Sequence, residues 1–257
     1  MLRFALLLAS AFLIGAPAAM AGETVTYKDG PTTLEGYVAH ATKPNAPIVM
    51  IVHQWKGLGA YEKSRADMLA KQGYTAFAVD MYGQGIRPQD PKDAGAMAGK
   101  YKGDSALARQ RMTAALNYAK TIPNADTTRI AVIGYCFGGT MALELARSGA
   151  DIKSVVSFHG ALASPAPVNQ ADIIKASIAI HHGADDPHVP PTEVRGFEAE
   201  MKAAKADWTF TEYAGAVHSF TEKEAGNDPS KGAAYNEKAD KRSWEAALDL
   251  LKETLGS

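Results

Sequence analysis

Residues 128–139 read TRIAVIGYCFGG, and this stretch decides the fold. The apolar run Thr128–Gly134 is typical of a strand buried on both faces, as in a parallel sheet. The Ala- and Leu-rich segment Thr140–Arg147 predicts a helix. Cys136 stands between them in a G-x-Cys-x-G pattern, where a tight turn strains the central residue and a Cβ on either glycine would collide with its neighbours. The sequence therefore predicts a strand, a sharp turn that carries a thiol, and a helix.

The segments on either side extend this unit into an α/β domain. Buried or alternating runs predict strands at Thr24–Tyr27, Thr33–Ala39, Pro47–His53, Tyr74–Asp80, Ser154–Phe158, Ser177–His182 and Trp208–Tyr213. Helical patterns cover Ala60–Gln72, Ala94–Lys120 with a break near Gly103, Thr192–Ala204 and Gly232–Leu255, and Met81–Lys92 is expected to be a loop. Regular alternation of strands and helices predicts a mostly parallel central sheet flanked by helices on both faces. We find no repeat or linker, so residues 22–257 are expected to form one domain.

Residues 1–21 are expected to be a secretory signal peptide. Arg3 is followed by the apolar stretch Phe4–Ile14, and Ala19-Met20-Ala21 forms a small-x-small cleavage site before Gly22. The alternative is a membrane anchor, but this apolar stretch of about a dozen residues is shorter than the roughly 20 that span a bilayer. We therefore expect a mature protein without a membrane span, in a bacterial periplasm.

Composition limits the possible functions. The 257 residues carry 27 basic and 28 acidic side chains, a formal charge of −1, which argues against a nucleic-acid partner. The single cysteine excludes an internal disulfide framework and a cysteine-cluster metal site. His181 and His182 are adjacent on a strand and face opposite sides, so no metal site is expected there. Cys136 is then either an inert buried thiol or a nucleophile.

Its position favours a nucleophile. A helix N-terminus favours thiolate over thiol, and a thiol nucleophile needs a histidine base and an orienting acid. After a strand–nucleophile–helix turn of this kind, acid and base follow in that order along the chain. The turn at residues 183–187 (GADDP) offers Asp185 or Asp186 as the acid, and the loop at residues 214–220 (AGAVHSF) offers His218 as the base.

These residues resemble the dienelactone hydrolase family of α/β-hydrolases. The resemblance rests on VHQWKGL at 52–58, DMYG at 80–83, GYCFGG at 134–139, and GADDPHVP at 183–190 with HSF at 218–220. It implies an α/β-hydrolase fold and a cofactor-free hydrolase of ester or lactone bonds. Carried over by position, it makes Cys136 the nucleophile, Asp186 the acid and His218 the base, and it forms the oxyanion hole from the backbone N–H groups of Phe137 and Trp55.

Two positions depart from the family pattern. Gln54 stands where the family commonly has a glutamate that helps to activate the thiol, which would leave activation to His218. Just after the catalytic histidine, where dienelactone hydrolases have an arginine that grips the substrate carboxylate, this chain reads SFTE at 219–222. Glu222 would repel a carboxylate, and we expect Arg87 as a replacement anion contact. Both departures argue against dienelactone itself as the substrate. The predicted substrate pocket consists of Gln54, Tyr82, His159, Phe220 and Arg87.

The prediction is thus an exported hydrolase that forms an acyl-enzyme on Cys136. A broad-specificity carboxylesterase or thioesterase on the same residues is the alternative, followed by a non-catalytic binding protein on the same fold. The expected partner is a small-molecule ester or lactone. By analogy with the family, we expect a monomer or weak oligomer.

Overall fold

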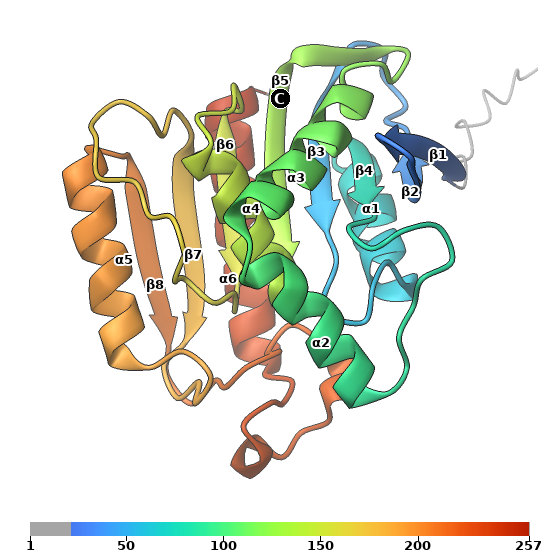
Figure 1. Ribbon diagram of the computed structural model, residues 1–257. Coiled ribbons are helices and arrows are strands. Elements are labelled where there is room, and N and C mark those ends of the chain that lie inside the picture. Colours follow the sequence, from blue (N-terminus) through green and yellow to red (C-terminus); the bar gives the residue numbers. More distant parts are fainter. Residues whose placement is uncertain (1–21, 257) are drawn as a thin grey trace, which may run out of the picture.

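One eight-stranded sheet runs through the middle of the molecule (Figure 1). The computed structural model describes residues 22–256, so the predicted signal peptide lies outside the described residues. The strands are β1 (Glu23–Asp29), β2 (Thr32–Ala39), β3 (Ala46–Val52), β4 (Thr75–Val79), β5 (Ala125–Tyr135), β6 (Ser154–Phe158), β7 (Ser177–Gly183) and β8 (Trp208–Tyr213). They lie in the order β1-β2-β4-β3-β5-β6-β7-β8. The pairings of β1 with β2 and of β2 with β4 are antiparallel, and all others are parallel.

Helices cover both faces of this sheet. In residues 22–256 the α-helices are α1 (Ala60–Lys71), α2 (Pro91–Lys102), α3 (Ser105–Ala119), α4 (Phe137–Arg147), α5 (Pro191–Ala204) and α6 (Glu237–Leu255). One apolar core joins the sheet to α2, α3, α4 and α5, and a second core joins it to α1 and α6. Figure 1 shows α3 and α4 in front of the sheet and α6 behind it. The predicted α/β architecture is confirmed.

Strand β3 shows why a continuous apolar run was the right signal. Ile48, Met50 and Val52 pack into the core under α2–α5, whereas Val49 and Ile51 pack into the core under α1 and α6. All five side chains are fully buried. Because alternate residues of a strand face opposite sides, a strand covered by helices on both faces has to be apolar throughout.

Several helix starts differ from the prediction. The segment predicted as Ala94–Lys120 is divided at Gly103 as expected, but its first part, α2, begins at Pro91 rather than Ala94, with Asp90 as its N-cap. Asp104 caps α3 by accepting the Leu107 N–H at 3.0 Å. Helix α4 begins at Phe137 rather than Thr140, directly after the turn. Helix α6 begins at Glu237 rather than Gly232, because Asn236 is its N-cap. In α3 and α6 a capping side chain, and not the first apolar residue, determines where the helix begins, whereas α4 has no side-chain cap and begins at the strained turn.

The carboxyl ends of the parallel strands meet at one edge of the sheet. The loops that leave β3, β5, β7 and β8 there carry Trp55, Cys136, Asp186 and His218. This is the edge where open α/β sheets form their ligand sites. None of the helices in residues 22–256 is long and apolar enough to cross a membrane.

Candidate active site

The turn between β5 and α4 holds Cys136 in an unusual backbone conformation. Its φ is 53° and its ψ is −117°. A Cβ on Gly134 would lie 2.1 Å from the carbonyl oxygen of Gly138, and one on Gly138 would lie 2.2 Å from that of Val52. Both glycines are therefore required by close backbone packing, and this packing presses the start of α4 against the end of β3.

Three side chains from three loops form a hydrogen-bonded chain at this turn. The Sγ of Cys136 lies 3.0 Å from Nε2 of His218, and Nδ1 of His218 lies 2.8 Å from Oδ2 of Asp186. The backbone N–H of His188 donates to Oδ1 of Asp186 at 2.8 Å. Asp185 is exposed, and its backbone N–H donates to the carbonyl of Ala216 at 3.0 Å. The structure thus brings Asp186, and not Asp185, to the histidine.

The charges of this chain stabilise one another. Burial raises the pKa of the Cys136 thiol, but the nearby His218 charge and hydrogen bond outweigh burial, so that the pKa lies below its ordinary value. Burial lowers the pKa of His218, whereas Cys136 and Asp186 raise it by more. Burial raises the pKa of Asp186, but the hydrogen bond and charge of His218 are the main factors that lower it, and the pKa lies below its ordinary value. A thiolate–imidazolium pair is the state that these contacts favour at neutral pH.

Cys136 and His218 lie on the wall of a cavity of about 440 Å³. Trp55 and Phe137 lie on its wall beside Cys136 and His218. The remaining lining residues are Gly95, Ala98, Gly99, Lys102, Thr140, Ala161, His188, Val189, Ser219 and Ala233. A small molecule that enters this cavity can therefore reach the thiol and the imidazole together.

Comparison with known proteins assigns the family. The model of the dienelactone hydrolase family matches residues 34–255. The chain belongs to this family. The predicted membership is confirmed, and with it the predicted class of hydrolase.

Solved structures agree with this assignment. A dienelactone-hydrolase-like promiscuous phosphotriesterase, P91, from metagenomic libraries is 36% identical, with a TM-score of 0.85 over 93% of this chain and 100% of its own. A protein named m3DLH is 35% identical, with a TM-score of 0.88 over the same shares. Dienelactone hydrolase from Anabaena variabilis, 17% identical, matches in fold with a TM-score of 0.67 over 92% of this chain and 100% of its own. The predicted α/β-hydrolase fold is confirmed.

Three residues predicted to line the dienelactone hydrolase pocket lie behind its wall instead. Tyr82, His159 and Phe220 are buried and do not border the cavity. The Tyr82 hydroxyl donates to the carbonyl of Trp55 at 2.9 Å. His159 accepts the Cys136 N–H at Nδ1 (3.2 Å), and the Phe220 ring lies edge-on to His159 with centroids 5.1 Å apart. These side chains support the residues that do line the cavity.

The two departures from the dienelactone hydrolase pattern influence each other. Burial raises the pKa of the Glu222 carboxyl, and the Gln54 side chain lowers it by less. Gln54 is buried and does not border the cavity, so its predicted place in the pocket is wrong.

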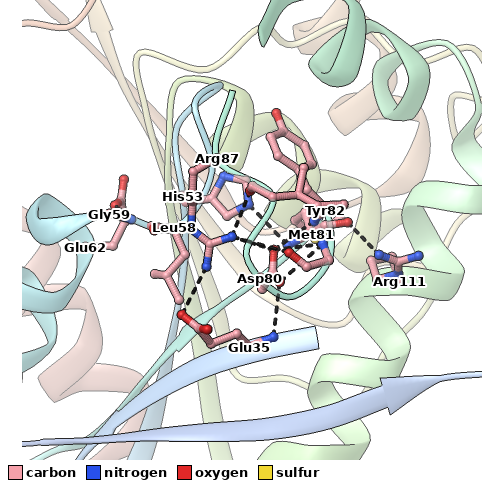
Figure 2. Close-up of polar contacts among 12 residues, drawn as sticks. Glu35, His53, Leu58, Gly59, Glu62, Asp80, Met81, Tyr82, Arg87 and Arg111 are labelled. Carbon is pink, nitrogen blue, oxygen red and sulfur yellow. Dashed lines mark hydrogen bonds and ion pairs between the residues drawn. The ribbon is translucent and has the colours of Figure 1, made fainter. Parts of the chain in front are cut away.

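Arg87 is not an anion contact in the cavity, and this prediction is wrong. Its guanidinium donates to the carbonyls of Leu58 and Ile86, and it lies 3.7 Å from the buried Asp80 carboxylate (Figure 2). Glu35 is a second acidic partner at 3.4 Å. Arg87 therefore fastens the loop after β4 to the loop after β3, outside the cavity.

The sequence reading missed α2 as a wall of the site. Gly95, Ala98, Gly99 and Lys102 all border the cavity. Their spacing follows the helical repeat, which places them on one face of the helix. A helix face of small residues with one lysine was the sequence signal that could have identified this wall.

In residues 22–256, no group of three or more histidine, cysteine or acidic side chains is arranged to hold a metal ion.

Proposed function

We propose that this protein hydrolyses ester or lactone bonds through a Cys136 acyl-enzyme. One observation carries the proposal. The Cys136 Sγ lies 3.0 Å from His218 Nε2 on the wall of an open cavity, and Asp186 lies 2.8 Å from the other ring nitrogen. A nucleophile, a base and an orienting acid within hydrogen-bond reach are what acyl transfer requires.

Acylation begins with attack of the Cys136 thiolate on the substrate carbonyl carbon. The electron pair of the C=O double bond moves to oxygen, and the N–H groups of Phe137 and Trp55 stabilise this oxyanion. One such donor contributes about 2.7–4 kcal/mol to transition-state stabilisation. When the intermediate collapses, the C–O bond breaks and His218 Nε2–H protonates the leaving oxygen. In a lactone, the released hydroxyl stays attached to the acyl group.

Deacylation uses the same groups in reverse order. Neutral His218 takes a proton from water through Nε2, and the resulting hydroxide attacks the thioester carbonyl. Collapse of this second intermediate breaks the C–S bond, which releases the acid and restores the thiolate. Asp186 holds Nδ1–H throughout, and this keeps Nε2 directed at the thiol.

The test is Cys136→Ala, assayed on p-nitrophenyl acetate and on a small lactone such as dihydrocoumarin. We expect kcat/KM to fall by about 10⁴-fold or more, because the nucleophile is removed. Acyl-enzyme trapped on Cys136 and identified by mass spectrometry would support the same conclusion. Unchanged turnover in a Cys136→Ala protein with a wild-type unfolding midpoint would refute the proposal.

A second candidate activity is phosphotriester hydrolysis at the same site. It is favoured by the 36% identity to P91 over 93% of the chain, since that protein is a promiscuous phosphotriesterase. The thiolate would attack phosphorus while the same two N–H groups face the phosphoryl oxygen, and the P–O bond to the leaving group would break as His218 protonates the leaving oxygen. Water activated by His218 would then cleave the P–S bond and restore the thiolate. Comparing kcat/KM for paraoxon with kcat/KM for p-nitrophenyl acetate ranks the two activities. Comparing kcat/KM for acyclic esters with kcat/KM for lactones ranks the two classes of acyl substrate.

We also propose that the protein is exported. The apolar stretch Phe4–Ile14 and the Ala19–Ala21 site support this proposal. If the full-length chain is expressed in a Gram-negative bacterium, the mature protein should be recovered from the periplasm and begin at Gly22. An intact N-terminus in the cytoplasm would contradict export.

A further inference from the structure

His53 is a fully buried histidine at the end of β3 that the proposed mechanism does not use. Its Nε2 accepts the backbone N–H of Met81 at 3.1 Å, and its Nδ1 lies 2.5 Å from the backbone carbonyl oxygen of Gln54 (Figure 2). A backbone N–H can only donate and a carbonyl can only accept. The ring must therefore carry its proton on Nδ1 and donate it to Gln54.

The charge state of the ring is consistent with this assignment. Burial lowers the pKa of His53 to about 4, so the ring is neutral at pH 7. Its centroid lies 4.7 Å from that of Tyr82 and 5.7 Å from that of Phe137, and these two rings also contact each other, so His53 packs in a cluster of three rings. His53 thus acts as a fixed neutral donor.

The peptide that receives this hydrogen bond is the one that carries the Trp55 N–H. The Gln54 carbonyl also accepts the Gly57 N–H at 3.2 Å, and the Trp55 carbonyl accepts the Tyr82 hydroxyl at 2.9 Å. On the other side, the Gln54 N–H donates to Glu62 Oε1 at 3.2 Å. Within residues 22–256, the Trp55 N–H is the backbone group of this pair of residues that has no protein partner.

The direction of this free N–H follows from the geometry of the peptide. In a trans peptide the C=O and N–H groups point to opposite sides. Because His53 holds the Gln54 carbonyl on the buried side, the N–H of Trp55 is turned away from that side. Trp55 and Cys136 border the same cavity, and His53 does not border it.

We propose that His53 is a positioning residue of the oxyanion hole, which fixes the Gln54–Trp55 peptide so that the Trp55 N–H faces the carbonyl under attack. The inference rests on the proposed acyl-transfer function. It assigns to His53 no contact with substrate and no proton transfer. Tyr82 assists by holding the next carbonyl of the same loop.

Two substitutions separate the two hydrogen bonds of the ring. In His53→Asn the amide nitrogen is attached to Cγ, as Nδ1 is in histidine, so it can still donate to the Gln54 carbonyl. In His53→Gln the amide group takes the place of Nε2, so it keeps the contact with Met81 and loses the one with Gln54. Both variants bury an amide at the same site and serve as controls for each other.

Two reactions of the same thiol provide the readout. Hydrolysis of p-nitrophenyl acetate develops an oxyanion, whereas alkylation by iodoacetamide displaces iodide at a saturated carbon and develops none. We expect His53→Gln to lower kcat by about 10- to 100-fold, as for a displaced oxyanion donor, with the iodoacetamide rate unchanged. His53→Asn should remain closer to wild type in kcat, also with unchanged alkylation. Affinity for a trifluoromethyl ketone, whose thiol adduct carries an oxyanion, should fall in parallel with kcat.

Tyr82→Phe provides a second route if the His53 variants fold poorly, because it removes only the hydroxyl that holds the Trp55 carbonyl. It should lower kcat and leave alkylation unchanged. Equal loss of hydrolysis and alkylation in His53→Gln, equal kcat in His53→Gln and His53→Asn, or wild-type kcat in both His53→Gln and Tyr82→Phe would each overturn the inference. Failure of the proposed function is a separate result, namely turnover by Cys136→Ala.

Discussion

At the scale of single residues, the state of the Cys136 thiol depends mainly on one partner. Burial by itself raises the pKa of this thiol, and the His218 charge and hydrogen bond are the main factors that lower it. Gln54 adds no negative charge beside the thiol and instead lowers the pKa of Glu222. Because position 54 carries no carboxylate, we expect thiolate formation to depend mainly on the histidine.

This dependence predicts the effect of His218→Gln. Without the imidazolium, burial dominates, and the pH midpoint of the iodoacetamide reaction of Cys136 should shift upward relative to wild type. The measurement is the alkylation rate between pH 5 and pH 10, where the wild-type midpoint should lie below the ordinary thiol pKa. Lys102→Gln, which removes a weaker positive influence, should shift the midpoint upward by less. A midpoint that is the same in His218→Gln and wild type would show that the two side chains do not form an ion pair.

At the scale of elements, the sequence was most informative where packing alone decides. Continuous apolar runs located the buried strands, and Gly134 and Gly138 located the turn, because both features follow from close packing between strand and helix. It was harder to predict which side chains face the cavity. Tyr82 and Phe220 lie in loops that follow strands β4 and β8, but their side chains turn into the interior, and the loop around Arg87 has no repeat from which to infer a direction.

The start of α4 offers a prediction at this scale. Gly138→Ala would place a Cβ 2.2 Å from the Val52 carbonyl oxygen. We expect it to lower the free energy of unfolding by about 1–3 kcal/mol, as for an overpacked core, and to reduce kcat because it separates α4 from the loop of Trp55. Urea denaturation and p-nitrophenyl acetate hydrolysis measure the two effects.

Gly196→Ala, in the exposed part of α5, is the matched control. A Cβ there meets nothing within 4 Å, and neither glycine has a positive φ. This variant should be about 0.5–1 kcal/mol more stable than wild type, since alanine is the better helix former. Equal stability of Gly138→Ala and Gly196→Ala would contradict the close contact between α4 and β3.

At the scale of the whole molecule, buried polar side chains link the elements that surround the site. Arg147 of α4 is almost fully buried and binds Glu200 of α5 at 2.7 Å and the Leu162 carbonyl at 2.7 Å. On the other face, Arg65 of α1 binds Asp240 of α6 at 2.6 Å. Buried charges of this kind are strongly destabilising when one partner is removed. On each face of the sheet, two helices are therefore linked to each other by an ion pair in addition to packing on the sheet.

The buried histidines make the stability of the whole fold depend on pH. Burial lowers the pKa of His181 to about 4, below the 6.5 of the unfolded chain. Between these values the unfolded state binds more protons than the folded state, so stability is fully present above pH 6.5 and is lost as the pH falls toward 4. His53 has the same direction of shift and adds to this loss. Acid should therefore destabilise the fold in this window.

His181→Phe should remove one part of this pH dependence. The phenyl ring can occupy the same space beside Phe158, and the orphaned Nε2 of the histidine disappears. Between pH 7 and pH 4 the free energy of unfolding should fall by about 3 kcal/mol less in His181→Phe than in wild type. Urea denaturation at a series of pH values measures the difference. Tyr213→Phe removes the hydroxyl 3.0 Å from Nδ1 but keeps the ring that titrates, so it should retain the wild-type pH dependence at lower overall stability. If His181→Phe shows the wild-type pH dependence, protonation of His181 does not drive acid unfolding.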